Sequence, residues 1–583
     1  MNRTPEEIKT FLERTLLTVE KPGRYVGGEL NQVVKNWETT LTKVLLAFPD
    51  IYDIGLPNLG LMILYDQLNQ YPELLAERTY APWVDMEKNL RDHQMPLFSL
   101  ETKHQASDFD VLAFSLPYET IYTNALNMID LSAIPLHTED RTMDDPFVIA
   151  GGHSAYNPEP MAEFIDIFIV GDGEDILLEV VNQISEGKKV DKTRKEILLR
   201  VAKMDGVYIP ALYTSEFDGE GNYIGLIPIH KEAKSVILKH IASELPMPLL
   251  KPLVPNIDVV HNRIAVEIMR GCSRGCRFCH AGFINRPIRE RSIEEIVSAV
   301  ETALDNTGFE EVALLSLSSS DYSHIAELID TLKQKFKDRN LSISLPSLRI
   351  DSFSIDLMEK LRGKRSGGFT LAPEAASDHM RGIINKPISE DALLETAKAI
   401  YERGWTTIKL YFMIGQPFET EEDVIKIADL CNKVLKAGKD AIGGRAKVNV
   451  SVSTLIPKPH TPFQWAAMNT PDQIREKQQL IRKNFKYRAI KASFSNPRES
   501  WLEGTLTKGD RRLSKVIETA WGKGARFDAW RDQYRQDIWE KAFAECNVEP
   551  EEYIYRKRGT DEIFPWDHIS TGVDKSFIKN EFF

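Results

Sequence analysis

Residues 270–283 read RGCSRGCRFCHAGF and hold three of the five cysteines of the 583-residue chain. Cys272, Cys276 and Cys279 follow the spacing Cys-x3-Cys-x2-Cys. Thiolates this close together on one glycine-containing loop favour a soft metal centre. A [4Fe–4S] cluster normally takes four cysteines. Because Cys431 and Cys546 stand alone in helical patterns, we expect the fourth iron to remain open to a small molecule.

A zinc ion held by the three cysteines and His280 is the alternative interpretation of this stretch. Structural zinc sites usually draw paired cysteines from two places in the chain, and the sequence contains no second pair. The spacing therefore favours iron and sulfur over zinc. The two remaining cysteines are expected to be small buried hydrophobic residues.

The three cysteines follow the first strand-like run of a series in which strands and helical patterns alternate. This alternation predicts a (βα)6 partial barrel over residues 258–470. The expected strands are 263–271, 312–318, 342–348, 368–374, 407–415 and 448–457.

A Cys-x3-Cys-x2-Cys loop after the first strand of such a barrel resembles the signature of the radical SAM superfamily. Phe278, an aromatic residue directly before the last cysteine, is also typical of it. The resemblance implies a [4Fe–4S] cluster on the three cysteines, with S-adenosyl-L-methionine on the fourth iron. An external one-electron reductant would then drive cleavage to methionine and a 5′-deoxyadenosyl radical, a chemistry that belongs to the cofactors.

The same resemblance suggests which strand ends hold S-adenosylmethionine. The second strand ends in SLSSSDY, where the superfamily usually has a Gly-Gly-Glu-type motif, so Ser319 and Ser320 would supply hydroxyls and amides. Arg349 is expected to pair with the methionyl carboxylate, Glu374 to hold the ribose, and Gly415 to let backbone approach the adenine. The alternative is a structural ion pair between Arg349 and Glu374, and an ordinary turn at Gly415.

An earlier part of the chain shows a second alternation of short apolar strands and amphipathic stretches. The expected strands are 43–49, 110–116, 146–152 and 166–174. This pattern predicts a doubly wound, Rossmann-like α/β domain. Glycine and aspartate gather just after each strand, at the edge where such sheets bind ligands.

Three of these strand ends resemble the cobalamin-binding domain of cobalamin-dependent radical SAM enzymes. The first loop has the spacing of a D-x-H-x-x-G motif, but tyrosine replaces the histidine that binds cobalt in that family. The resemblance implies bound cobalamin, whose nucleotide tail would use the space beside small residues. The alternative is a domain that has lost the cofactor and only caps the barrel. The residues concerned are Asp50, Tyr52, Gly55, Ser115, Gly151 and Gly152.

The order of these segments resembles an uncharacterised family of radical SAM proteins with an N-terminal cobalamin-binding-like domain. A hairpin is expected around residues 218–222. The predicted organisation is a helical lead-in (1–40), the Rossmann-like domain (41–185), a linking segment (186–257), the barrel (258–470) and a helical, partly basic C-terminal domain (471–583).

Charge and composition narrow the class of protein further. The formal net charge is −13, cysteine is too scarce for a secreted disulfide scaffold, and neither a signal peptide nor a membrane span is visible. We therefore expect a cytoplasmic, soluble protein. Residues 475–526 nevertheless carry 14 Lys and Arg against five Asp and Glu, with interspersed aromatic residues. This segment predicts either an RNA or ribosomal partner or, as the favoured alternative, amphipathic helices with their aromatic residues turned inward.

The leading functional hypothesis is a cobalamin-dependent radical SAM enzyme, with methylation of an unactivated carbon as one reaction open to it. The second hypothesis is a radical SAM enzyme that modifies RNA or the ribosome and has lost cobalamin. Because no cysteine precedes Cys272, sulfur insertion by a second cluster is disfavoured. The third is a non-catalytic iron–sulfur protein that binds RNA. The sequence assigns no catalytic side chain and no substrate.

Overall fold

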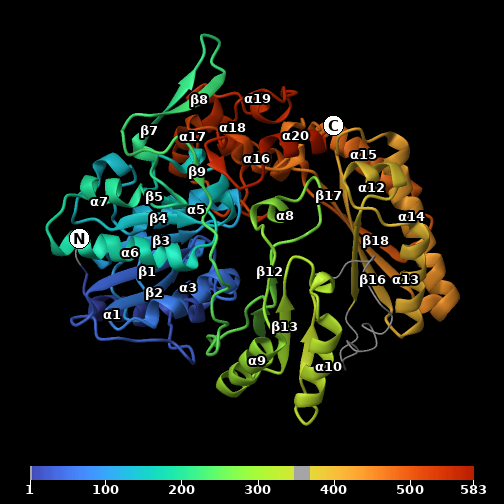
Figure 1. Cartoon of the computed structure of the whole chain (residues 1–583), viewed down its shortest axis with the longest axis horizontal. Coiled ribbons are helices and arrows are strands. Elements are labelled where there is room, and N and C mark those ends of the chain that lie inside the picture. The colour runs from blue at the N-terminus through green and yellow to red at the C-terminus, as the bar shows by residue number, and fades with distance from the viewer. Residues whose placement is uncertain (1–2, 347–367, 583) are drawn as a thin grey trace.

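The computed structural model describes residues 3–346 and 368–582 of the chain. Figure 1 shows three parts: an α/β domain in blue and teal, a barrel-like pair of sheets in green to orange, and a cap of C-terminal helices in red. The cap lies against both of the other parts.

The sheet of the first domain has the strand order β2-β1-β3-β4-β5-β6. The first five strands are parallel and β6 is antiparallel to β5. The predicted doubly wound α/β class is therefore confirmed, and the carboxyl ends of five strands lie along one edge. The strands are β1 Thr42–Phe48, β2 Leu74–Tyr80, β3 Val111–Ser115, β4 Phe147–Gly151, β5 Ile167–Ile169 and β6 Val207–Tyr208.

Strand β2 was not among the expected strands, because its centre reads Glu77-Arg78 and looks polar. Both side chains are nevertheless fully buried. The Arg78 guanidinium pairs with Glu101 at 2.6 Å and with Glu29 at 3.0 Å, and these partners make burial of the cation tolerable. Glu29 comes from the lead-in, which begins with helix α1 (Pro5–Thr15) and continues as irregular chain packed on the sheet.

Five further helices accompany this sheet, and α3 contacts α6. In the linking segment, β7 (Tyr213–Phe217) and β8 (Tyr223–Pro228) form an antiparallel hairpin that projects from the molecule in Figure 1. The Asp218 amide donates to the Asn222 carbonyl at 2.9 Å, which confirms the expected turn. The helices are α2 Tyr52–Gly55, α3 Leu59–Asn69, α4 Val84–Asp92, α5 Tyr122–Leu131 and α6 Glu174–Lys189, and the linking segment adds α7 Arg194–Val201.

The barrel consists of two parallel sheets, β10-β13-β14 and β15-β16-β17-β18. All six expected strands are present within the described residues. A further strand, β18, follows residue 470 and pairs with β17, so the second sheet extends into the region expected to be helical. The strands are β10 Ile264–Glu267, β13 Glu311–Leu315, β14 Ser342–Ser344, β15 Phe369–Glu374, β16 Thr407–Ile414, β17 Lys447–Thr454 and β18 Ile490–Phe494.

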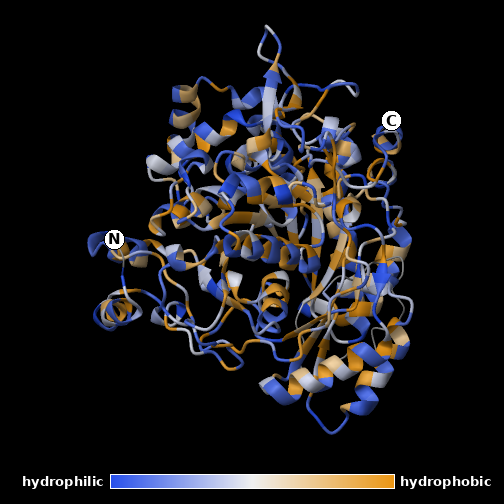
Figure 2. Ribbon diagram, turned by 60° about the vertical axis from the view of Figure 1, so that its left-hand side comes forward, coloured by the Kyte–Doolittle hydropathy of each residue, from blue (hydrophilic) through white to orange (hydrophobic). Residues whose placement is uncertain are grey.

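Helices cover the outside of both barrel sheets, and Figure 2 shows the hydrophobic strands in orange inside more polar helices. Apolar residues of these helices and strands form separate cores for the two sheets. The main helices are α9 Ile293–Thr307, α10 Ile325–Lys335, α12 Asp378–Ile383, α13 Glu390–Glu402 and α14 Glu421–Ile442.

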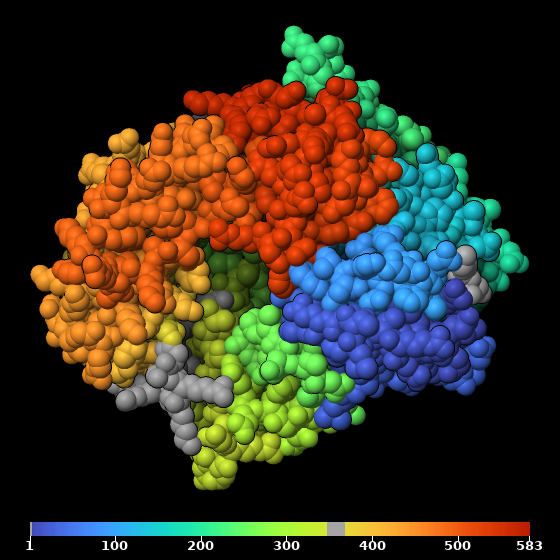
Figure 3. Space-filling model, turned by 180° about the vertical axis from the view of Figure 1, so that it is seen from behind, coloured from blue at the N-terminus to red at the C-terminus, as the bar shows by residue number. Residues whose placement is uncertain are grey.

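The C-terminal helices share one hydrophobic core with the first domain, to which Val516, Ile517 and Trp539 contribute. From behind, Figure 3 shows a hollow bordered by the red C-terminal helices and the two barrel sheets. Across the described ranges, no helix combines the length and apolar character needed to cross a membrane. The helices are α15 Pro471–Asn484, α16 Pro497–Lys508, α17 Arg512–Gly522, α18 Gln536–Cys546, α19 Pro550–Ile554 and α20 Lys575–Phe582.

Candidate cofactor site between two sets of strand ends

The three clustered cysteines lie on the loop between β11 (Met269–Arg270) and α8 (His280–Ile284). All three are partly buried. The Gly282 amide donates to the Cys279 sulfur at 3.4 Å. Burial, together with the neighbouring Cys276 and Cys272 thiolates, raises the pKa of the Cys279 thiol to about 11. The three sulfurs are therefore near enough to influence one another electrostatically.

The described residues of this loop do not form a site for a single metal ion. In the part of the chain that the structure describes, no three His, Cys, Asp or Glu side chains converge on a position for one ion. A [4Fe–4S] cluster makes a different demand, because each thiolate binds its own iron. His280, the fourth ligand in the zinc alternative, has a buried Nε2 atom without a hydrogen-bond partner, and its ring packs against Tyr156 and His153.

The serine-rich turn after β13 is tied to the cysteine loop. Ser319 is fully buried, and its hydroxyl donates to the Leu314 carbonyl at 3.3 Å. Ser320 lies in the same short turn, which runs Ser319–Asp321. Asp321 pairs with Arg274 of the cysteine loop at 2.6 Å. The turn thus lies beside the cluster position, as expected, although the Ser319 hydroxyl is already used inside its own loop.

Two other predicted S-adenosylmethionine residues lie at the ends of β15 and β16. Glu374 has a positive φ of 64°, and burial raises the pKa of its carboxyl group although Lys386 lies 3.5 Å away. Gly415 has a φ of 83°, and its amide donates to Glu419 at 2.9 Å. Positive φ at Gly415 explains the glycine in structural terms. Arg349, and with it the alternative pair with Glu374, lies outside the described residues.

Phe278 joins these strand ends to the cysteine loop. Its side chain packs in a small hydrophobic cluster that contains Ala375, which follows Glu374, and Met413 of β16. The cysteine loop, the end of β15 and the end of β16 therefore meet at one place. The structure brings together the predicted residues of this group that it describes.

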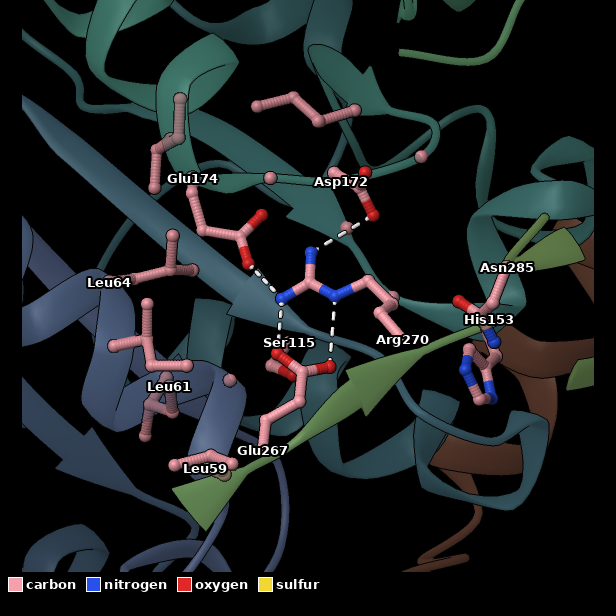
Figure 4. A pocket seen from close by; sticks show the side chains of 18 of the residues that line it. Leu59, Leu61, Leu64, Ser115, His153, Asp172, Glu174, Glu267, Arg270 and Asn285 are labelled. Atoms are coloured by element: carbon pink, nitrogen blue, oxygen red, sulfur yellow. Dashed lines mark hydrogen bonds and ion pairs between the residues drawn. The ribbon is translucent and has the colours of Figure 1, made fainter. Parts of the chain in front are cut away.

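A cavity of about 520 Å³ opens between the carboxyl edge of the first domain and the strand ends of the barrel. Ser115, Gly151 and Gly152 line it, as the sequence predicts. Its apolar arm runs beside α3 and α6 and is lined by Leu59, Leu61, Leu64 and Leu177 (Figure 4). The opposite wall comes from β10, β11 and the segment after β13.

Arg270 crosses this cavity wall and joins the two domains. Its guanidinium pairs with Asp172 at 3.0 Å, Glu174 at 2.6 Å and Glu267 at 2.9 Å (Figure 4). Burial alone would raise the pKa of Asp172, but a hydrogen bond from Arg289 and the charge of Arg270 hold it below its ordinary value. The sequence does not single out Arg270, because its partners Asp172 and Glu174 lie about a hundred positions away in the other domain.

The structure does not bring the first-loop residues Asp50, Tyr52 and Gly55 to this cavity, which corrects their expected placement. The Tyr118 hydroxyl and the Trp530 indole donate to Asp50 at 2.9 and 3.0 Å. The Tyr52 hydroxyl donates to Glu29 at 3.0 Å, and its side chain is only 2% exposed. A side chain at Gly55 would lie 2.5 Å from the Tyr80 ring. Close packing within the first domain accounts for this loop.

His153 is a residue of the cavity that the sequence analysis missed. It directly follows Gly152 and lines the cavity, where its exposed ring lies near Asn285 (Figure 4). The signal was present in the stretch IAGGHS, which places an imidazole immediately after the glycine pair at a strand end.

The basic segment 475–526 packs largely as the favoured alternative describes. Trp501 is buried in the core shared with the first domain, and Phe485 and Tyr487 pack against the second barrel sheet. Arg511 pairs with Glu159 at 3.0 Å and joins the C-terminal helices to the first domain. The predicted RNA or ribosomal partner stays a prediction.

Two family matches coincide with the two domains that form the cavity. Residues 266–431 match the radical SAM superfamily. Residues 60–210 match the family described as radical SAM proteins, N-terminal. Residues 266–431 thus carry a radical SAM domain, and the resemblance found in the cysteine loop is confirmed.

Individual relatives agree with this assignment. An uncharacterised protein of Methanocaldococcus jannaschii is 29% identical over 82% of this chain and 91% of its own length. The ribosomal protein uS12 methylthiotransferase RimO of Thermoanaerobacter sp. is 23% identical over 51% of this chain and 71% of its own length.

Among solved structures, the radical SAM methyltransferase TsrM of Kitasatospora setae, with cobalamin and a [4Fe–4S] cluster bound, is 14% identical. The match has a TM-score of 0.49 and covers 86% of this chain and 99% of that one. The cobalamin-dependent enzyme OxsB, also 14% identical, has a TM-score of 0.48 and covers 93% of this chain and 78% of its own.

Proposed function

We propose that this radical SAM enzyme cleaves S-adenosylmethionine reductively at a [4Fe–4S] cluster held by Cys272, Cys276 and Cys279. The observation that carries the proposal is the meeting of the cysteine loop with the ends of β13, β15 and β16. When bound, the cluster supplies the electron that breaks the sulfonium bond. Phe278 packs with apolar neighbours at this place, and Glu374 is positioned to accept hydrogen bonds from a ribose.

We further propose that the cavity beside this centre holds cobalamin, and that the reaction is methylation of an unactivated carbon. The cavity follows the carboxyl ends of β3, β4 and β5, the edge where doubly wound sheets bind ligands. Its apolar arm beside α3 and α6 fits a buried nucleotide tail. Because the other wall is formed by the barrel, a group bound here would lie between the first domain and the proposed cluster.

The residues around the cavity hold this arrangement together. The ion pairs of Arg270 fix the loop after β5 against the start of the barrel. Arg289 adds a second contact to Asp172 at 2.5 Å. These largely buried charge pairs connect the two domains and fix how they are oriented. These ion pairs favour one site shared by both domains rather than two domains that move independently.

Anaerobic reconstitution with iron and sulfide, followed by dithionite and S-adenosylmethionine, tests the first proposal. We expect 5′-deoxyadenosine from the wild type and none from Cys276→Ala. Cys546→Ala is the matched control, because Cys546 lies in α18, far along the chain from the cysteine loop, and it should retain product formation. Absence of 5′-deoxyadenosine from the reconstituted wild type would refute the cleavage.

Incubation with hydroxocobalamin and subsequent gel filtration test the second proposal. A corrinoid absorption spectrum that elutes with the protein supports it. Formation of 5′-deoxyadenosine without retained corrinoid would refute the cobalamin proposal and support a cobalamin-free radical SAM enzyme instead.

A further inference from the structure

His153 is not part of the cobalamin-binding-like motif of the first domain. It begins the short turn His153–Tyr156 directly after β4, and its ring is exposed to the cavity. Its ring meets the ring of His280 edge to face, with the centroids 6.0 Å apart. His280 directly follows Cys279, so the imidazole of His153 lies between the apolar arm of the cavity and the cysteine loop.

The carboxylates and the tyrosine hydroxyl of the cavity wall are already engaged. The carboxylates of Asp172, Glu174 and Glu267 are paired with Arg270. The Tyr156 hydroxyl donates to the Ile284 carbonyl at 3.2 Å. Of the described residues that line this cavity, His153 is the one that carries an imidazole.

Tyr52, at the motif position that would face a metal below a corrin ring, is not available for that role. Its hydroxyl donates to Glu29, and Glu29 is itself paired with Arg78 in a fully buried network. Turning the Tyr52 side chain toward the cavity would leave this network with an unsatisfied carboxylate, which is costly in a dry interior. The loop after β1 therefore offers no ligand at the cavity.

We propose that His153 is the protein ligand to the cobalt of the corrinoid bound in this cavity, an inference that rests on the cobalamin proposal above. One ring nitrogen donates its lone pair to the metal and displaces a water molecule, so no proton or electron is exchanged. Imidazole is a common ligand for transition metals in its neutral form.

Binding of cob(II)inamide followed by electron paramagnetic resonance tests the assignment. Cobinamide lacks the nucleotide base, so nitrogen superhyperfine splitting of the cobalt signal must come from the protein. We expect splitting from a single nitrogen in the wild type and its loss in His153→Ala. Asn285→Ala is the matched control, because Asn285 lines the same cavity without an imidazole, and it should retain the splitting.

The outcomes separate this inference from the proposal beneath it. Retained cob(II)inamide without nitrogen splitting, or with splitting that persists in His153→Ala, overturns the ligand assignment and leaves the cobalamin proposal standing. Failure of the wild type to retain both cobinamide and hydroxocobalamin overturns both. A circular dichroism spectrum of His153→Ala identical to that of the wild type shows that loss of the splitting is not loss of the fold.

Discussion

The loops after β1 and β4 leave the same sheet at the same edge, yet they have opposite environments. The loop after β1 is closed: Asp50 accepts hydrogen bonds from Tyr118 and Trp530, and Tyr52 donates to Glu29. The loop after β4 is open: Gly152 and His153 line the cavity that faces the barrel. A sequence motif at a strand end therefore does not by itself predict access to a ligand.

The difference has a structural cause in segments far away in the sequence. Trp530 comes from the C-terminal region and Glu29 from the lead-in, and both cover the β1 end of the edge. The β4 end faces the start of the barrel, where Arg270 holds the domains at a fixed separation. Substitutions at the closed loop should change stability, whereas substitutions at the open loop should change ligand binding.

The largest effect on the closed side is expected for Arg78→Met. Removal of the guanidinium leaves Glu29 and Glu101 buried without their cation. Loss of one partner of a buried ion pair costs about 3–5 kcal/mol. Denaturant unfolding should show this decrease in the free energy of unfolding. An unchanged midpoint would mean that the closed loop does not depend on this network.

Asp528→Asn, in the cap of C-terminal helices, should change how the free energy of unfolding depends on pH. Burial raises the pKa of Asp528 from 3.8 to about 6, against hydrogen bonds from Thr123 and Trp539. The folded state therefore favours the protonated carboxyl group, and the free energy of unfolding of the wild type should fall as pH rises across this interval.

The asparagine variant should lack this slope and should be more stable than the wild type at pH 7, by up to about 3 kcal/mol. Unfolding midpoints measured between pH 4 and pH 7 for both proteins provide the test. Parallel pH profiles would contradict the buried titration of Asp528.

Gly152→Ala tests the open loop at the cavity mouth. Gly152 has a φ of 107°, and a Cβ atom there would lie 2.7 Å from the Leu116 carbonyl oxygen. Backbone strain of this kind costs about 1–3 kcal/mol. Because the loop lines the cavity, retention of hydroxocobalamin should fall along with thermal stability. If the variant loses thermal stability but retains hydroxocobalamin fully, the corrinoid binds elsewhere.

Trp530→Phe should have the smallest effect. It removes the indole donor to Asp50, while Tyr118 and the Ile51 amide remain as donors. The loss of one such hydrogen bond costs about 1 kcal/mol. Calorimetry should detect the change as a modest decrease in Tm, and corrinoid retention should equal that of the wild type. Reduced retention would show that the loop after β1 participates in binding after all.

Local patterns in the sequence predicted the strands and the cysteine loop. The apolar runs of β1, β3 and β4 are buried as their composition indicated, and the six expected barrel strands are present, although no residue of β14 is buried. Strand β2 escaped prediction because Glu77 and Arg78 are buried by virtue of distant partners. Pairing of β18 with β17 likewise depends on tertiary contacts that no local window contains.

Residues of the candidate site could be predicted only where their position at a strand end determines whether they face the cavity. Ser115, Gly151 and Gly152 reach the cavity as expected. The environment of Tyr52 depends on Glu29, and that of Arg270 on Asp172, so both needed the assembled structure. The spacing of the family motif indicated which loop to consider. Packing from distant segments determines which side chain can reach a ligand.

The central claim, that the open part of this edge holds a corrinoid, is tested most directly by filling the cavity. Leu64→Trp places a bulky indole ring in the apolar arm (Figure 4), and Leu17→Trp is the control because Leu17 is 93% exposed. The measurement is the ratio of corrinoid to protein after gel filtration. We predict near-equimolar retention in the wild type and in Leu17→Trp, and at least a tenfold loss in folded Leu64→Trp, about 1.4 kcal/mol or more in binding free energy. Equal retention in all three proteins would contradict the account.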